Sequence, residues 1–160
     1  MINKINKFFE FEPFESKMKK SAGVIIVLNN EKILLCHPAN NAKWFGSYSF
    51  PKGGIDEGET TKQAALRELF EETSVLITES MISKEPLILD YMNHKKKNVV
   101  YKRIYFFTLY IDDISEIGLD SEIIPKEKLP LDEIDWAGFV TKEEAKIRLF
   151  HRSVPMLDKI

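Results

Sequence analysis

Apolar residues in this chain occur in short runs separated by polar turns, and this pattern predicts mainly strands. The runs Gly23–Leu28 and Lys32–His37 predict two buried strands. Asn29 and Asn30 lie between them, and asparagine tolerates the left-handed backbone angles of a hairpin turn. Further strands are expected over residues 48–50, 87–92, 99–111 and 134–140.

The stretch Lys62–Thr73 has the composition and the period of an α-helix. It is rich in helix-forming residues and contains neither Gly nor Pro, and Thr60 or Thr61 can cap its start. At about 100° per residue, its apolar side chains share one face, which predicts the buried side of the helix. These apolar residues are Ala65, Leu66, Leu69 and Phe70.

A second helix is expected near the C-terminus. Thr141–Glu144 has the sequence of a capping box, and the helix should continue through Leu149. Residues 112–132 are polar and contain one Gly and two Pro, which predicts a loop or an insertion between the last strands.

Residues 1–20 predict an N-terminal extension, and residues 21–160 predict a single domain without an internal linker. The extension mixes phenylalanines with acidic residues, and the alternation over Phe9–Glu12 indicates a short strand. Its phenylalanines are expected to pack on the domain. The alternative is a homodimer contact over residues 8–14, because exposed apolar clusters mark interfaces.

Composition narrows the classes of function. The chain has 160 residues and a net charge of −2, so no global basic field draws it to nucleic acid or anionic lipid. No run reaches the roughly 18 apolar residues of a membrane span, and no signal peptide is evident. Cys36, the one cysteine, lies in an apolar run and is predicted to be a core thiol. A reducing, cytoplasmic setting is therefore expected.

Glu68, Glu71 and Glu72 fall together on a second face of the first helix, because residues three and four apart are neighbours on a helix. They also lie near the helix C-terminus, where the dipole disfavours anions. A bound divalent cation supplies the missing counter-charge, and carboxylate oxygens suit Mg²⁺ or Mn²⁺. The alternative is a solvated acidic helix face without a ligand.

The spacing from Gly53 through Glu59 to Arg67–Val75 resembles the Nudix box, the signature of the Nudix (MutT-like) hydrolase superfamily. Its pattern is G-x5-E-x7-R-E-U-x-E-E-x-G-U, in which U is a bulky aliphatic residue. Every fixed position matches except one, where Ser74 stands in place of the family's Gly. A Gly after a helix end usually supplies a left-handed residue, so the departure concerns the helix exit more than the chemistry.

The resemblance implies an α/β fold, namely the Nudix α/β/α sandwich around a mixed sheet, and hydrolysis of a diphosphate linked to another group. It implies that Glu68, Glu71 and Glu72 are metal ligands for Mg²⁺, with Mn²⁺ as a substitute. Glu68 or Glu71 would also orient or deprotonate the attacking water. By the same resemblance, Arg67 and Glu59 would hold the loop against the helix.

Three further metal contacts are candidates from the same reasoning. By its position before the box, Lys52 would offer its backbone carbonyl to the metal. Glu59 is an additional candidate ligand. The acids of the late polar stretch supply one more, and Glu133 is the one retained as a candidate.

Candidate substrate contacts lie outside the box. Trp44, in a polar loop, would stack on a nucleobase or cover the edge of the core. Lys52, Lys102 and Arg103 are candidates for phosphate binding, although strand alternation directs Lys102 and Arg103 to opposite faces of the sheet.

The substrate itself stays open at this stage. The Trp44 loop, the residues around Lys52 and the late stretch Trp136–Phe139 are similar to the dinucleoside polyphosphate (Ap4A-type) hydrolase branch. This resemblance favours a dinucleoside polyphosphate or a nucleoside triphosphate. ADP-ribose, nucleotide sugars and 5′-triphosphorylated RNA are alternatives, the last because Lys95–Lys97 form a local basic run. A non-catalytic nucleotide-binding protein is the alternative from another class. Such proteins typically lose the acidic residues of the box, whereas this chain retains them.

Overall fold

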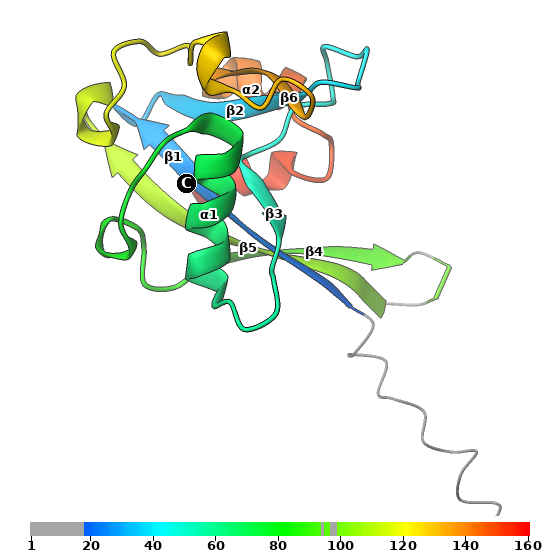
Figure 1. Ribbon diagram of the computed structural model, residues 1–160. Coiled ribbons are helices and arrows are strands. Elements are labelled where there is room, and N and C mark those ends of the chain that lie inside the picture. Colours follow the sequence, from blue (N-terminus) through cyan, green and yellow to red (C-terminus); the bar gives the residue numbers. More distant parts are fainter. Residues whose placement is uncertain (1–17, 94, 97–98) are drawn as a thin grey trace, which may run out of the picture.

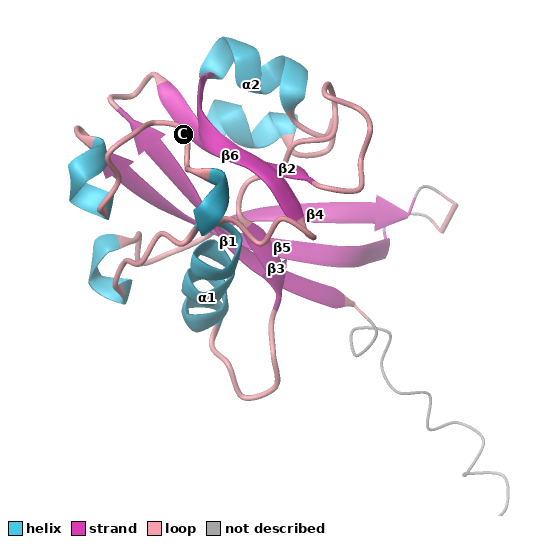
Figure 2. Cartoon of the chain, turned by 45° about the horizontal axis from the view of Figure 1, so that its top comes forward, coloured by secondary structure: helices cyan, strands magenta, loops and turns pink. Residues whose placement is uncertain are grey.

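A computed structural model describes residues 18–93, 95–96 and 99–160, and within them six strands form one sheet between two helical layers (Figures 1 and 2). The strands are β1 (Lys19–Leu28), β2 (Lys32–Pro38), β3 (Lys52–Gly54), β4 (Leu87–Asn93), β5 (Val99–Ile111) and β6 (Ile134–Thr141). The α-helices are α1 (Thr61–Thr73) and α2 (Lys142–Arg148). Short 3-10 helices cover Glu79–Met81, Ile114–Ile117, Lys126–Lys128 and Val154–Lys159.

The sheet is mixed, with the strand order β4-β5-β1-β2-β6 and with β3 paired to β1. β1 runs parallel to β5 along its whole length, and the other pairs are antiparallel. On its other side β1 pairs with β3 over Ser21–Gly23 and with β2 only at Val27 and Leu28. The sheet therefore divides along β1, and this division brings β3 beside α1. The architecture confirms the predicted α/β sandwich with a mixed sheet.

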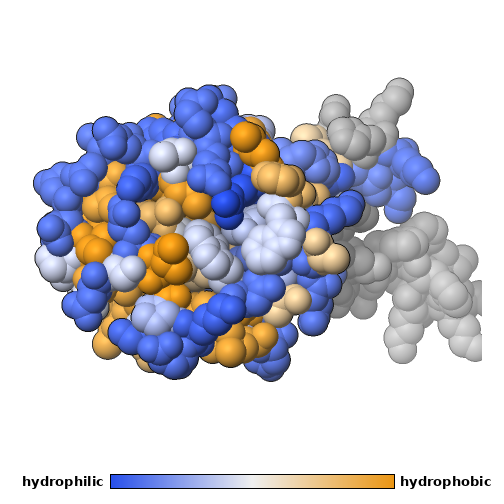
Figure 3. Space-filling view, turned by 90° about the horizontal axis from the view of Figure 1, so that it is seen from above, coloured by the Kyte–Doolittle hydropathy of each residue, from blue (hydrophilic) through white to orange (hydrophobic). Residues whose placement is uncertain are grey.

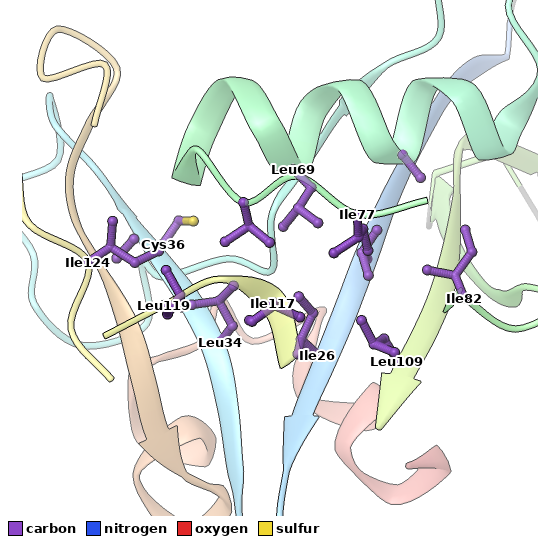
Figure 4. Close-up of a cluster of buried hydrophobic side chains, with 14 of the residues drawn as sticks. Ile26, Leu34, Cys36, Leu69, Ile77, Ile82, Leu109, Ile117, Leu119 and Ile124 are labelled. Atoms are coloured by element: carbon purple, nitrogen blue, oxygen red, sulfur yellow. The ribbon is translucent and has the colours of Figure 1, made fainter. Parts of the chain in front are cut away.

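Both faces of the sheet are covered, which explains why β1 is apolar along most of its length. Val24 and Ile26 point to the α1 face, where Leu69 of the helix, Ile26 and Leu34 belong to one buried cluster (Figure 4). Ile25 and Val27 point to the opposite face, which α2 and the C-terminal 3-10 helix cover. The outer surface seen from above is largely hydrophilic, with hydrophobic patches between the polar side chains (Figure 3).

The predicted hairpin at Asn29 and Asn30 is confirmed, since both residues have positive φ angles of 52° and 55°. The predicted strand over residues 48–50 is wrong. Tyr48 and Ser49 make only isolated bridges, to Leu149 and Cys36, and the strand that leads into the box is β3. Tyr48 is buried because its ring packs in the cluster on the α2 face of the sheet, and not because it pairs in a sheet ladder.

Helix α1 begins as predicted, at a capping box in which Thr60 and Gln63 bond each other's backbone N–H groups. Ala65 and Leu69 are buried as expected, but the prediction for Phe70 is wrong, because its side chain is 49% exposed. Thr73 takes the buried place in the last turn and donates its hydroxyl to the Leu69 carbonyl at 2.6 Å.

The polar stretch 112–132 contains more structure than the predicted loop. Two 3-10 turns lie in it, and four apolar residues in or next to these turns are buried in the cluster on the α1 face: Ile117, Leu119, Ile124 and Leu129. Helix α2 follows β6 as predicted. Thr141 caps it by accepting a hydrogen bond from the Glu144 N–H at 3.1 Å, although only this half of the predicted capping box is present.

Ser74 ends α1 in the left-handed conformation, with a φ of 62°, and its hydroxyl donates to the Lys128 carbonyl. We expect the free energy of unfolding of Ser74→Gly to exceed that of Ser74→Ala by about 1 kcal/mol. Both variants lose the hydrogen bond, and only glycine removes the left-handed strain. Urea unfolding of the two variants measures this difference, and equal stabilities would contradict it.

The predictions for the N-terminal segment, including the strand at residues 9–12 and the homodimer contact over residues 8–14, concern residues 1–17 and lie outside the described residues. In the part of the chain that the structure describes, no helix combines the length and the apolar character that crossing a bilayer requires.

Candidate active site

The acidic face of α1 meets the backbone of β3. A Cβ atom placed on Gly53 would lie 2.1 Å from the Cδ atom of Glu68, so only glycine lets the strand lie this close to the carboxylate. A Cβ atom placed on the neighbouring Gly54 would meet nothing within 4 Å. The first glycine of the box is therefore a packing requirement for the position of Glu68.

Arg67 joins the acids to the loop before the helix. Its Nε and Nη2 atoms donate to both oxygens of Glu59, at 2.7 and 2.9 Å, and Nη2 donates to the Gly54 carbonyl at 2.8 Å. Nη1 donates to Glu68 at 3.0 Å and to Glu71 at 3.2 Å. The Arg67 bond and a backbone N–H lower the pKa of Glu59 to about 2. This bidentate pair holds the loop on the helix, as the resemblance implied.

Glu72 differs from the other acids of the site in its hydrogen-bond partner. Among the described residues, the hydrogen bond found for its carboxylate comes from the Lys52 backbone N–H, at 3.2 Å. Burial, with smaller contributions from the charges of Glu68 and Glu133, raises the pKa of Glu72 to about 8. Burial also raises the pKa of Glu68. A cation beside these carboxylates would relieve the cost of keeping them ionised.

The candidate ligands are carboxylate oxygens, which suit a hard divalent cation. One of these carboxylates, that of Glu72, is partly buried. In the described part of the chain, no three acidic, His or Cys side chains are gathered into a ready-made cation site. Arg67 engages two of the carboxylates, Glu68 and Glu71. The Glu133 carboxylate lies close enough to act on Glu72, although the two residues are distant in sequence.

The opposite face of the sheet carries lysines. A Cβ on Gly23 would lie 2.7 Å from the Cβ of Lys52, so the Lys52 side chain starts on this face. Lys102 lies 5.5 Å over the ring of Tyr91, and burial, with the nearby Lys52 and Lys19, lowers its pKa. These groups form a positive region on the face away from α1.

Arg103 follows Lys102 but serves a different contact. Its Nε and Nη2 atoms donate to the two oxygens of Asp90 on the neighbouring strand, at 2.7 and 2.9 Å, and this pair lowers the pKa of Asp90. The alternation predicted for the two residues agrees with these separate partners. Unlike Arg103, Lys102 has no ion pair with a carboxylate among the described residues.

Two residues next to the site were not assigned to it from the sequence. The Cys36 thiol is buried beside the Glu72 carboxylate, and burial followed by that charge raises its pKa well above the usual value. His37, the next residue, faces the other way and stacks on Trp44. Strand alternation in β2 predicts the opposite directions of these side chains, but it does not identify their partners.

The NUDIX domain model matches residues 17–156, so the chain belongs to the NUDIX family. Members of this family generally use divalent metal ions.

Among curated proteins, an RNA pyrophosphohydrolase of Erythrobacter litoralis is 41% identical over 59 residues, which cover 37% of this chain and 35% of that protein. An RNA pyrophosphohydrolase of Caulobacter vibrioides is 30% identical over 110 residues, covering 58% of this chain and 63% of that protein. The chain thus spans less than two thirds of the length of these relatives. Among solved structures, an Ap4A hydrolase of C. elegans superimposes with a TM-score of 0.62 at 22% identity, covering 89% of this chain and 94% of that chain.

Proposed function

We propose that this chain is a Mg²⁺-dependent pyrophosphohydrolase that cleaves a pyrophosphate bond in the 5′-polyphosphate of a nucleotide. The observation that carries this proposal is the state of Glu72. Its carboxylate is partly buried, receives a hydrogen bond from the Lys52 N–H, and lies next to Glu68 on the same helix. Such a group is costly for folding alone and well suited to holding a cation.

In this proposal Glu68, Glu71 and Glu72 would hold Mg²⁺, with Mn²⁺ able to substitute. Bound there, Mg²⁺ would supply positive charge for the phosphate oxygens and for the attacking water. The Lys52 carbonyl, Glu59 and Glu133 are additional candidate ligands. For Glu59 the bidentate bond to Arg67 favours a structural role instead.

The protein's own groups have separate tasks. Glu68 suits the general base, because burial raises its pKa toward the working pH and Gly53 fixes its position. Arg67 orients Glu68 and Glu71 through one guanidinium. On the other face of β3, Lys52 and Lys102 would bind the phosphate chain.

The 5′-triphosphorylated end of RNA is the substrate class we favour. Curated relatives at 30% and 41% identity are named RNA pyrophosphohydrolases. Dinucleoside polyphosphates are the second candidate, and the specific observation in their favour is the indole of Trp44, which is 55% exposed and available for a base. We also propose a cytoplasmic setting, from the composition and the single buried cysteine.

Release of phosphate and pyrophosphate from a panel of substrates tests the function. With Mg²⁺ present, we expect turnover of a triphosphorylated oligoribonucleotide to exceed that of ATP, diadenosine tetraphosphate and ADP-ribose, and EDTA should abolish it. Fastest turnover of diadenosine tetraphosphate would select the second candidate. Tight binding of these compounds without any turnover would contradict the enzyme and favour the non-catalytic alternative.

A further inference from the structure

His37 is a buried histidine of β2 with contacts on both ring nitrogens. Its ring is 1% exposed. Nδ1 lies 2.6 Å from an oxygen of Asp135, and Nε2 lies 2.9 Å from the Lys43 carbonyl oxygen. Both ring nitrogens thus have an oxygen within hydrogen-bond distance. The ring is therefore held from both sides, by the Asp135 side chain and by the backbone of Lys43.

Trp44 rests on this ring. The centroids of the indole and imidazole rings are 4.5 Å apart and the interplanar angle is 7°, which is a parallel stack. One face of the indole is thus covered, while the side chain as a whole is 55% exposed. A nucleobase of any kind can stack on an exposed flat aromatic face.

The contacts of His37 fix the middle of the loop that carries Trp44. The two ends of this loop have backbone anchors, from the Ala39 N–H to the Glu133 carbonyl at 2.9 Å and from the Gly46 N–H to the Ile147 carbonyl at 3.1 Å. Between these anchors, the Lys43 carbonyl accepts from His37, and the Ser47 hydroxyl donates to the same oxygen. His37 therefore sets the position of the indole as well as covering one of its faces.

The loop is connected to the acidic site through the start of β6. The Glu133 carbonyl accepts a hydrogen bond from the Ala39 N–H. The charge of the Glu133 side chain contributes to the raised pKa of Glu72. Asp135, two residues later, holds His37. The segment Glu133–Asp135 therefore holds His37 and also carries a charge that acts on Glu72.

We propose that His37 is a positioning residue that holds Trp44 as a stacking surface for the base of the nucleotide substrate, an inference that rests on the proposed function. The interaction is with the aromatic part of the substrate. Removing the indole of Trp44 should weaken binding of a nucleotide and leave binding of a bare phosphate chain unchanged.

Steady-state kinetics with the dinucleotide pppApG and Mg²⁺ test this proposal. We expect Trp44→Ala to raise KM on the order of tenfold with kcat within about twofold, and Trp44→Phe to change KM by less than about threefold, because a phenyl ring also stacks. The Ki of inorganic tripolyphosphate, which has phosphates and no base, should stay the same in each variant. Phe45→Ala is the matched control, since Phe45 is the adjacent aromatic side chain and is 67% exposed.

A double-mutant cycle separates positioning from general structure. His37→Gln should raise KM in the wild-type background and add nothing in the Trp44→Ala background, because it acts through the indole. Asp135→Asn, at a part-exposed side chain, makes the same comparison if His37→Gln does not fold. An unchanged KM in Trp44→Ala, a parallel rise in the tripolyphosphate Ki, or independent effects of the two substitutions would overturn the proposal. Absence of turnover by the wild type with every substrate would instead overturn the proposed function.

Discussion

Glu72→Gln is expected to lower kcat/KM in Mg²⁺ by about 1,000-fold, because an amide replaces the carboxylate that holds the cation against a polyanionic substrate. Loss of transition-state charge stabilisation of about 4 kcal/mol corresponds to this factor. The steady-state rate of phosphate or pyrophosphate release measures it. The matched control is Glu57→Gln, which makes the same charge change at an exposed position in the loop before α1 and should leave the rate unchanged.

The same substitution should preserve folding. The pKa of Glu72 is raised to about 8 in the folded protein, so the folded state binds this proton more tightly than the unfolded state does. Without metal, the wild type should therefore lose stability as the pH rises from about 5 to about 8. Glu72→Gln mimics the neutral acid and should show a weaker loss. Thermal unfolding across this pH range in EDTA measures the difference, and turnover within tenfold of the wild type would refute the metal assignment.

Gly53→Ala is expected to lower kcat/KM by about 100-fold while the protein remains folded. The new methyl group would overlap the Glu68 carboxyl, whose Cδ lies 2.1 Å from the Cβ position. A flexible carboxylate can move aside at low cost, but a displacement of about 1 Å in a catalytic group is costly for the rate. Rates and urea unfolding, measured together, distinguish a displaced Glu68 from a damaged fold.

Gly54→Ala is the control for this prediction. The adjacent glycine has open space around its Cβ position, with no atom within 4 Å, so this variant should retain nearly full activity. Equal losses in the two variants would indicate that the β3 backbone, and not the contact with Glu68, is what the substitution disturbs.

The acids of the site differ in their environments. Arg67 donates hydrogen bonds to Glu59, Glu68 and Glu71. Glu72 instead receives the Lys52 backbone N–H, and the Lys52 side chain acts on it only through its charge. A single arginine thus orders the loop and the first two acids of the helix. The remaining uncompensated charge is concentrated where a cation is proposed to bind.

Much of this arrangement could be predicted from the sequence, because it depends on local spacing. The helical period predicted the helix that carries Glu68, Glu71 and Glu72, and the Asn pair between two apolar runs predicted the hairpin at Asn29 and Asn30. Local spacing failed for Phe70, which is exposed, because the boundary of the buried face depends on what packs against the last turn. It also failed at residues 48–50, where ring burial resembles the pattern of a strand.

What the sequence by itself determined is the order of the strands along the chain, the acidic helix face and the family signature, since these follow from residues close together in the chain. Only the tertiary structure decided which distant groups meet. Asp135 reaches His37 across the β2–β6 pair, Glu133 acts on Glu72, and β3 lies against Glu68. The physical reason is that charge and burial act through space, so the environment of each group depends on strand pairing that no local pattern specifies.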